Sequence, residues 1–341
     1  TRRSSDLLRN RTVELAMLEL LNAACINSAC REAIFKNLSD WLSHVLTNGT
    51  DESSELAAVV LAKVRASGKD GALEANGKGQ EAESDVPELV ERFKGLMLNQ
   101  KGNVSNLIEG FAYSSVKPAV KEQLAKDPLF LRELVQTLRA NAADSSVLYG
   151  GLMTLMNLTD FLPNLSEEQK KISQLKSYAN ASANPKAGPD PLNEEDAVIA
   201  RCRAVVDAGA MPLLVECGKM RLPSVQELVS KIMLSLSRNQ ESRGILAQQG
   251  AIKLLLSIAT TQQDSTSSAQ NETTRNASHA LARILISVNP SHAFPSSGFP
   301  QITSAIRPLV SLLTSPEAPT LTVDQARDLL PIFESLLALT N

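Results

Sequence analysis

Histidine and cysteine are the residue types in this chain that could most readily provide a nucleophile, a general base or a metal ligand. The 341-residue sequence contains three histidines and four cysteines: His44, His279, His292, Cys25, Cys30, Cys202 and Cys217. None of them forms an HExxH or CxxC motif. We therefore interpret the cysteines as small buried apolar residues of a reducing compartment. We expect His279 to be packed or half-exposed on an apolar helix.

Two further motifs could support catalysis, and both have a simpler interpretation. Gly77-Lys78-Gly79 has the residue types of a phosphate-binding loop, but it lies in low-complexity sequence with no strand before it. The acidic pairs Glu167-Glu168 and Glu194-Glu195 fall in the first turns of expected helices, where carboxylates complement the helix dipole. The sequence therefore predicts a protein that is not an enzyme and that uses no cofactor or metal.

Composition excludes several other classes of function. Hydrophobic residues make up 43% of the chain but aromatic residues only 4%, which favours an aliphatic core of closely packed helices. The net charge of −3 gives no basic footprint for nucleic acid. No apolar run reaches the roughly 18 residues of a membrane span, and the first residues lack the apolar segment of a signal peptide. We therefore expect a cytoplasmic protein that binds no nucleic acid and does not insert into membranes.

A repeated pattern of helices decides the expected fold. Gly209 and Gly250 lie 41 residues apart, and each follows a short helical segment and precedes an apolar one. This spacing falls within the period of about 40–47 residues that is typical of armadillo and HEAT repeats. We expect each glycine to adopt the left-handed conformation that ends one helix before the next begins.

The long helices between these glycines have a clear apolar face. In 224–239 the apolar residues recur every three or four positions, which predicts an α-helix, and Ser224 three residues before Glu227 predicts a capping box. Asn193 and Asp196 predict the start of the preceding helix. The same spacing recurs in segments 13–24, 152–158, 277–288 and 333–339, and 306–313 resembles the helix start at 210–214. The sequence therefore predicts an all-α, right-handed armadillo/HEAT-like solenoid.

Breaks in this pattern suggest how the chain is divided. We expect armadillo-like repeats in 1–65 and 87–180, a disordered loop in 66–86, a linker in 181–193 and further repeats in 194–341. A Gln-, Ser- and Thr-rich stretch, 261–275, lengthens one repeat. Because the chain begins without Met and stops inside an apolar helical pattern, we expect it to be a fragment of a longer protein.

In such a stack the third helix of each repeat lines a groove that can bind another protein. Polar or small residues opposite the core face are the candidates for this groove: Asn22, Asn27, Asn157, Lys231, Ser235, Arg238, Asn239 and Arg283. A solvated helix face is the alternative for each of them. The repeated Trp and Asn residues of nuclear-import armadillo proteins are missing, because the only tryptophan, Trp41, lies outside a third helix.

Several segments resemble the UCS family of myosin-directed chaperones. The most specific are 280–295, 306–313 and 333–341, and the segments 109–115, 149–159 and 165–170 resemble the central armadillo region of that family, with 165–170 closer to fungal members. Segment 194–341 would then be the start of a UCS domain. The tetratricopeptide module of animal members is absent, as in fungal members, and the later UCS repeats would lie beyond Asn341.

The resemblance implies a chaperone whose groove binds a partly folded myosin motor domain, assists its folding and supports actomyosin function in cytokinesis. Hsp90 and a second copy of the chain are further candidate partners. The candidate binding residues are Lys231, Arg238, Asn239, Arg283, Asn289, His292 and Phe294. We expect 289–294 to form a semi-rigid loop in which Phe294 is an exposed anchor or, as we favour, a core residue. The alternative function is a general armadillo scaffold for signalling or adhesion proteins.

Overall fold

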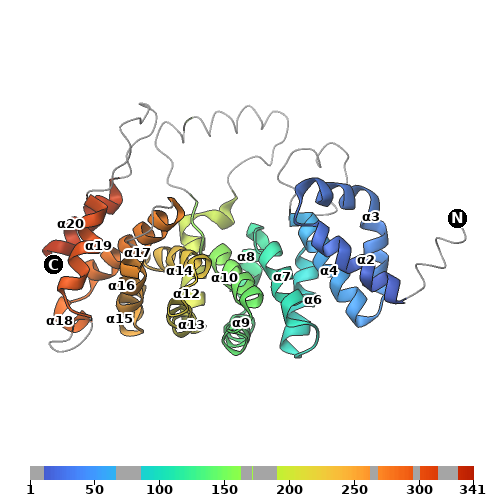
Figure 1. The fold of residues 1–341 in the computed structure, drawn as a ribbon, viewed down its shortest axis with the longest axis horizontal. Coiled ribbons are helices and arrows are strands. Elements are labelled where there is room, and N and C mark those ends of the chain that lie inside the picture. The colour runs from blue at the N-terminus through green and yellow to red at the C-terminus, as the bar shows by residue number, and fades with distance from the viewer. Residues whose placement is uncertain are drawn as a thin grey trace, which may run out of the picture. The chain divides into compact units, whose positions relative to one another are not determined.

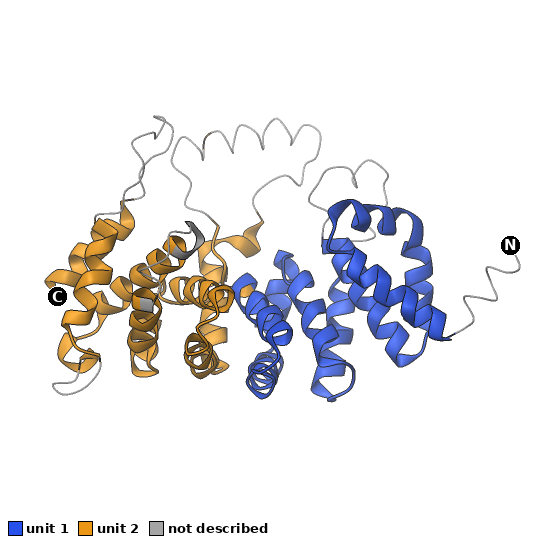
Figure 2. Cartoon of the chain, in the orientation of Figure 1, with its two compact units in different colours: residues 1–157 blue, residues 158–341 orange. Residues whose placement is uncertain are grey.

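The computed structural model describes residues 11–66, 86–162, 171, 190–261, 268–294, 300–313 and 329–341. The chain divides into two compact units, Thr1–Asn157 and Leu158–Asn341 (Figure 2). Within the described ranges every regular element is helical and no strand occurs, which confirms the predicted all-α repeat fold. The predicted loops and linker lie largely outside these ranges, as do Gly77-Lys78-Gly79 and Glu167-Glu168.

Unit 1 is a stack of α-helices (Figure 1). These helices are α2 (Arg11–Ala24), α3 (Ser28–Asn48), α4 (Asp51–Ala66), α6 (Val86–Leu98), α7 (Val104–Ser114), α8 (Pro118–Ala125), α9 (Pro128–Ala140) and α10 (Ser145–Thr159), whose last two residues belong to unit 2. Helix α4 packs against α2, α3 and α7. Three phenylalanines join α6, α7 and α9, because the rings of Phe93 and Phe111 lie 5.8 Å apart and those of Phe111 and Phe130 4.8 Å apart.

Unit 2 contains three successive repeats, each ending in a third helix. A 3-10 turn, η2 (Pro191–Asn193), precedes α12 (Glu195–Asp207), α13 (Ala210–Gly218) and α14 (Pro223–Leu236); the second repeat is α15 (Gln240–Gln248), α16 (Ala251–Thr261) and α17 (Ser268–Ser287), and the last is α18 (Pro290–Ala293), α19 (Thr303–Leu313) and α20 (Leu330–Thr340). The third helices pack in order, α14 against α17 and α17 against α20.

The two glycines that define the repeat behave as predicted. Gly209 has φ 83° and Gly250 has φ 96°, so both adopt the left-handed conformation between a first and a second helix. Close packing between successive repeats depends on a third glycine at the end of α13. A Cβ atom on Gly218 would lie 2.1 Å from Leu254 Cδ1 of α16, so glycine there lets the Leu254 side chain pack directly against α13.

Three predictions about helix starts are wrong. The N-cap of α14 is Leu222, not Ser224, because Pro223 fits the first helical position and places the N-cap two residues earlier. Asn193 ends η2, and Glu194 is the N-cap of α12 without a side-chain hydrogen bond. Pro308 lies inside α19, which begins at Thr303, so it is not part of a helix start.

Burial agrees with the sequence for most of the chemically active residue types. Cys25, Cys202 and Cys217 are buried, but Cys30 is exposed on α3, which contradicts the prediction for that residue. His279 is buried, with 7% of its surface exposed. No helix in the described ranges has the length and hydropathy of a membrane span.

Candidate partner-binding face

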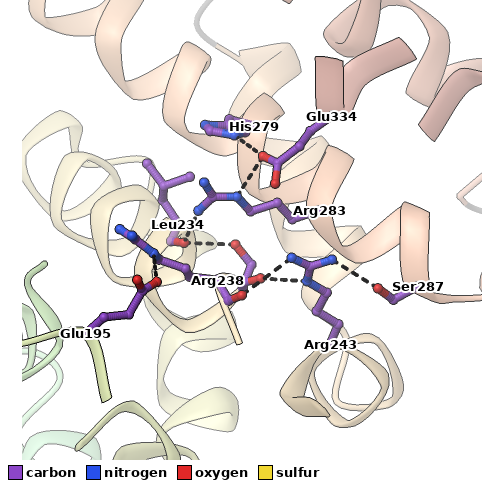
Figure 3. A network of polar contacts seen from close by, with 9 residues as sticks. Glu195, Leu234, Arg238, Arg243, His279, Arg283, Ser287 and Glu334 are labelled. Atoms are coloured by element: carbon purple, nitrogen blue, oxygen red, sulfur yellow. Dashed lines mark hydrogen bonds and ion pairs between the residues drawn. The ribbon is translucent and has the colours of Figure 1, made fainter. Parts of the chain in front are cut away.

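The candidate site is the face formed by α14, α17 and α20 together with the adjoining starts of α12 and α15, which we call the third-helix face of unit 2 (Figure 3). In α14 the apolar residues pack into the core, which leaves polar residues for this face, whereas α20 also exposes Phe333 (58%) and Leu336 (48%). In α14 those core residues include Val225, Leu228, Val229, Ile232, Met233 and Leu236, all buried. Polar side chains from neighbouring helices meet here in one continuous network (Figure 3).

Glu334 of α20 is the acceptor at one end of this network. Its Oε2 atom accepts hydrogen bonds from Nε2 of His279 and from Nε of Arg283, the latter at 2.8 Å. Arg283 also donates from Nη1 to the main-chain oxygen of Leu234 in α14, at 3.2 Å. Arg283 therefore connects all three third helices, and its side chain is only 8% exposed. We conclude that Arg283 holds the face together and is poorly placed to contact a partner directly.

The charged groups around Glu334 offset the cost of burying its carboxylate. Burial by itself raises the pKa of Glu334, but the hydrogen bond from His279 and the charge of Arg283 outweigh it and hold that pKa below its ordinary value. Burial lowers the pKa of the Arg243 guanidinium, whereas the Glu334 carboxylate acts in the opposite direction. Glu334 is therefore an ionised carboxylate at neutral pH, shared among cationic neighbours.

Arg243 of α15 joins the end of α14 to α17. Its Nε donates to the main-chain oxygen of Ser237 at 2.8 Å, and its Nη1 donates to Ser287 Oγ at 3.1 Å. Its Nη2 donates to the main-chain oxygen of Arg238 at 3.4 Å. A cation at the carboxyl end of a helix satisfies carbonyl groups that have no partner within the helix. Arg243 was not predicted as a site residue, and its position inside α15, seven residues after the last residue of α14, gives no local signal of this role.

Two of the predicted residues remain accessible on this face. Arg238 donates from Nε to Oε1 of Glu195 at 2.8 Å, and its guanidinium lies 4.3 Å from the centre of the Phe161 ring. Its side chain is 25% exposed. Lys231 has 34% exposure and forms an ion pair of 2.8 Å with Glu227 within α14. These contacts orient both cations without burying them, so Lys231 and Arg238 are suited to meet acidic groups of a partner.

Asn239 and Asn289 have structural roles at helix starts. Asn239 is the N-cap of α15, and its Oδ1 accepts from the main-chain nitrogen of Glu241 at 3.2 Å. Asn289 is the N-cap of α18, and its Oδ1 accepts from the main-chain nitrogen of Ser291 at 3.0 Å. Caps of this kind typically stabilise a helix by about 1 kcal/mol. The predicted semi-rigid loop at 289–294 is therefore a capped helical turn.

His292 and Phe294 lie apart from the polar network. His292 is exposed and, with Asn289 and Lys253, lines a cavity of about 360 Å³ between the second and last repeats. Phe294 is only 8% exposed, which supports its assignment to the core. The structure thus divides the seven predicted binding residues between the third-helix face and the turn at α18.

The groove candidates in unit 1 have partners within that unit. Asn27 is the N-cap of α3. Asn22 donates to Oε2 of Glu109 at 3.3 Å, and Asn157 donates to the main-chain oxygen of Ala112 at 3.2 Å. Helix α4 offers little surface to a partner, because residues 53–64 of that helix are all buried.

A buried lysine in α4 was not predicted. Lys63 has a side-chain exposure of 3% and forms an ion pair with Glu109 of α7, with its Nζ atom 2.6 Å from Oε1. Its ammonium group also lies 5.3 Å from the centre of the Tyr113 ring. A lysine inside the apolar run 56–64 is a signal for a buried counter-charge, but the sequence gives no indication that Glu109 provides it.

Comparison with known proteins supports the resemblance to the UCS family. Residues 1–93 match the family model described as "Myosin-binding striated muscle assembly central". The chain is 26% identical over 336 residues to Protein unc-45 homolog B of Danio rerio, covering 96% of this chain and 33% of that protein. It is 27% identical over 341 residues to Ring assembly protein 3 of Schizosaccharomyces pombe, covering 99% of this chain and 40% of that protein.

Solved structures agree with these relationships. UNC-45 from Drosophila melanogaster is 26% identical, with a TM-score of 0.67, and the match covers 96% of this chain and 38% of that one. She4p has the same TM-score of 0.67 at 24% identity, which supports the fold. The chain spans between a third and two fifths of the length of the curated relatives described above.

Proposed function

Because the chain resembles the UCS family of myosin-directed chaperones along nearly its whole length, we propose that it binds a partly folded myosin motor domain and assists its folding. The observation that carries this proposal is the match of the chain to unc-45 homolog B and to Ring assembly protein 3, together with the myosin-binding description of the family model at residues 1–93. We assign the contact to the third-helix face of unit 2, and we expect binding and release to consume no nucleotide.

The arrangement of this face supports its assignment. Lys231 and Arg238 are held in place by Glu227, Glu195 and the Phe161 ring, so a partner would not have to order two freely rotating side chains. A partner carboxylate would still compete with the existing ion pairs, which limits the gain from each contact. We therefore expect modest, reversible binding, with a Kd of about 1 μM or roughly −8 kcal/mol, as a folding client requires.

A heat-aggregation assay tests the proposal. A myosin motor domain is warmed with and without the full chain, and light scattering is followed; we expect the chain to suppress the aggregation of the motor domain. Equal protection of an unrelated metabolic enzyme would contradict a myosin-directed function. A pull-down from a fungal lysate that recovers membrane or kinase proteins without myosin heavy chain would favour the general scaffold instead.

Paired charge reversals can locate the contact. The double variant Lys231→Glu and Arg238→Glu should lose most of the protection, because two oriented cations become anions. Lys126→Glu in unit 1 is the matched control, since Lys126 is 75% exposed and forms a comparable pair with Glu122 four residues earlier. Loss of protection in the control, or full protection in the double variant, would contradict the assignment of the myosin contact to the third-helix face.

The cellular setting follows from the same proposal. A myosin-directed chaperone would act in the cytoplasm and serve actomyosin assemblies, including those of cytokinesis. UNC-45 from C. elegans has been solved in complex with an Hsp70 peptide and with an Hsp90 peptide. Hsp90 is accordingly a second proposed partner of this chain, and a test for it is co-purification of Hsp90 with the chain and myosin.

A further inference from the structure

The turn between α13 and α14 presents a serine hydroxyl to solvent. Residues 221–224 are all exposed, and Arg221 has φ 52°, a left-handed conformation that is uncommon for a residue with a side chain. Ser224 follows in the second position of α14. We propose that Ser224 is a phosphorylation site for a basophilic protein kinase, meaning a kinase that selects an arginine three residues before the serine. This inference does not depend on the proposed chaperone function.

The sequence contains its own control for this assignment. Where both residues are described by the structure, an arginine stands three positions before a serine or threonine in two places, Arg221 with Ser224 and Arg275 with Ser278. Ser278 lies within α17 and is 0% exposed, whereas Ser224 is exposed. The two sites share the arginine spacing and differ in accessibility, so only Ser224 can be reached in the folded protein.

The start of α14 is also well suited to open locally. A kinase binds its substrate in an extended conformation, so the first turn of α14 must fray for the reaction to occur. The N-cap of α14, Leu222, makes no side-chain hydrogen bond, whereas Asn103 at the start of α7 accepts a hydrogen bond from Ser105 N at 2.9 Å. Fraying this turn exposes Val225 and Gln226, which are 2% and 1% exposed in the folded chain, and leaves the rest of α14 in place.

The reaction is an ordinary phosphoryl transfer from ATP. The Ser224 Oγ forms a bond to the γ-phosphorus while the bond from that phosphorus to the bridging oxygen breaks, releasing ADP. The hydroxyl proton passes to a carboxylate of the kinase. The product carries a phosphate of roughly −1.5 to −2 charge in the first turn of a helix, where the helix dipole and free main-chain amides stabilise an anion.

Site mapping by mass spectrometry tests the assignment. The full chain is incubated with the catalytic subunit of a basophilic serine kinase and Mg-ATP, and phosphorylated peptides are identified. We expect phosphate on Ser224 and none on Ser278. Arg221→Gln should lower kcat/KM at Ser224 by about tenfold or more, because a charge-assisted contact with the kinase is lost. Phosphate on Ser278 at an equal rate, no phosphate on Ser224, or an unchanged kcat/KM would overturn the proposal.

A stability measurement checks the structural consequence independently of any kinase. Ser224→Asp should raise the melting temperature of the full chain, because it places a carboxylate at a helix start that has no side-chain cap. Ser105→Asp is the matched control, since Ser105 occupies the same second position in α7 but follows the capped Asn103. We expect a smaller rise in the control. A lower melting temperature for Ser224→Asp would show that α14 does not accept an anion there and would overturn the proposal.

Discussion

Replacing Glu334 by glutamine should sharply destabilise unit 2, because the buried Arg283 guanidinium would lose its counter-charge. The Glu334 carboxylate accepts from His279 and from Arg283 Nε at 2.8 Å, and Arg283 is only 8% exposed. Glutamine keeps the size of the side chain but removes the negative charge. Loss of one partner from a largely buried ion pair costs about 3–5 kcal/mol, and we expect roughly 2–4 kcal/mol here because Glu334 retains 14% exposure.

Thermal unfolding of the full chain measures this effect. At about 2–4 °C per kcal/mol for a unit of this size, the transition of unit 2 should fall by roughly 4–16 °C. Hydrogen exchange of the α17 and α20 amides should accelerate in parallel, which assigns the change to this interface. Glu272→Gln is the matched control, because Glu272 is 61% exposed and lies 3.9 Å from its partner Lys231. The control should change stability by less than about 0.5 kcal/mol.

The effect of pH gives the prediction a second test. The pKa of Glu334 is lowered in the folded chain, so its contribution to stability is present above the ordinary carboxyl pKa and is lost as pH falls through the lowered value. The stability difference between wild type and Glu334→Gln should therefore shrink in acid. If the variant matches wild type at neutral pH, or if the difference grows as pH falls, the charge-pairing account of this interface is wrong.

Three further predictions test packing and exposure. Gly218→Ala should destabilise the fold by about 1 kcal/mol in urea titration, because its Cβ would lie 2.1 Å from Leu254 Cδ1 and this buried side chain would have to change its rotamer; a gain in stability would contradict the close packing. Phe294→Ala should cost about 3 kcal/mol, and weaker myosin binding without a lower melting temperature would instead make Phe294 an exposed anchor. Maleimide should label exposed Cys30 before Cys202, because burial raises the pKa of Cys202 to about 12, and the reverse order would contradict the assigned burial.

Local signals in the sequence were sufficient to predict the helical repeat. The spacing of Gly209 and Gly250 predicted the repeat. The position between two helices requires a left-handed conformation, which favours glycine, and this position recurs once in each repeat. The same local reasoning failed at Ser224, where two helix-start signals, Pro223 and a serine with Glu227, stood side by side. The proline determined the start because its fixed φ fits the first helical position.

The candidate site was only partly predictable, because its contacts join residues far apart in the chain. Lys231 could be selected from the polar side of α14 and Arg238 from the residues just after that helix, and both remain accessible. Arg283 could be selected in the same way, but its buried role depends on Glu334, 51 residues later. Glu334 lies within an apolar helix and gives no local sign of its partners, so only the packing of α17 against α20 reveals it.

Hydrogen-exchange mapping of the complex with a myosin motor domain is the most direct test of the proposed function. The full chain is exchanged alone and with a saturating amount of motor domain, and protection is compared peptide by peptide. We expect added protection in α14 around Lys231, at Arg238 after its end and in the adjoining α17, and none for α4, which is already buried. Unchanged exchange across α14 and α17 in a chain shown to bind the motor domain would contradict this expectation.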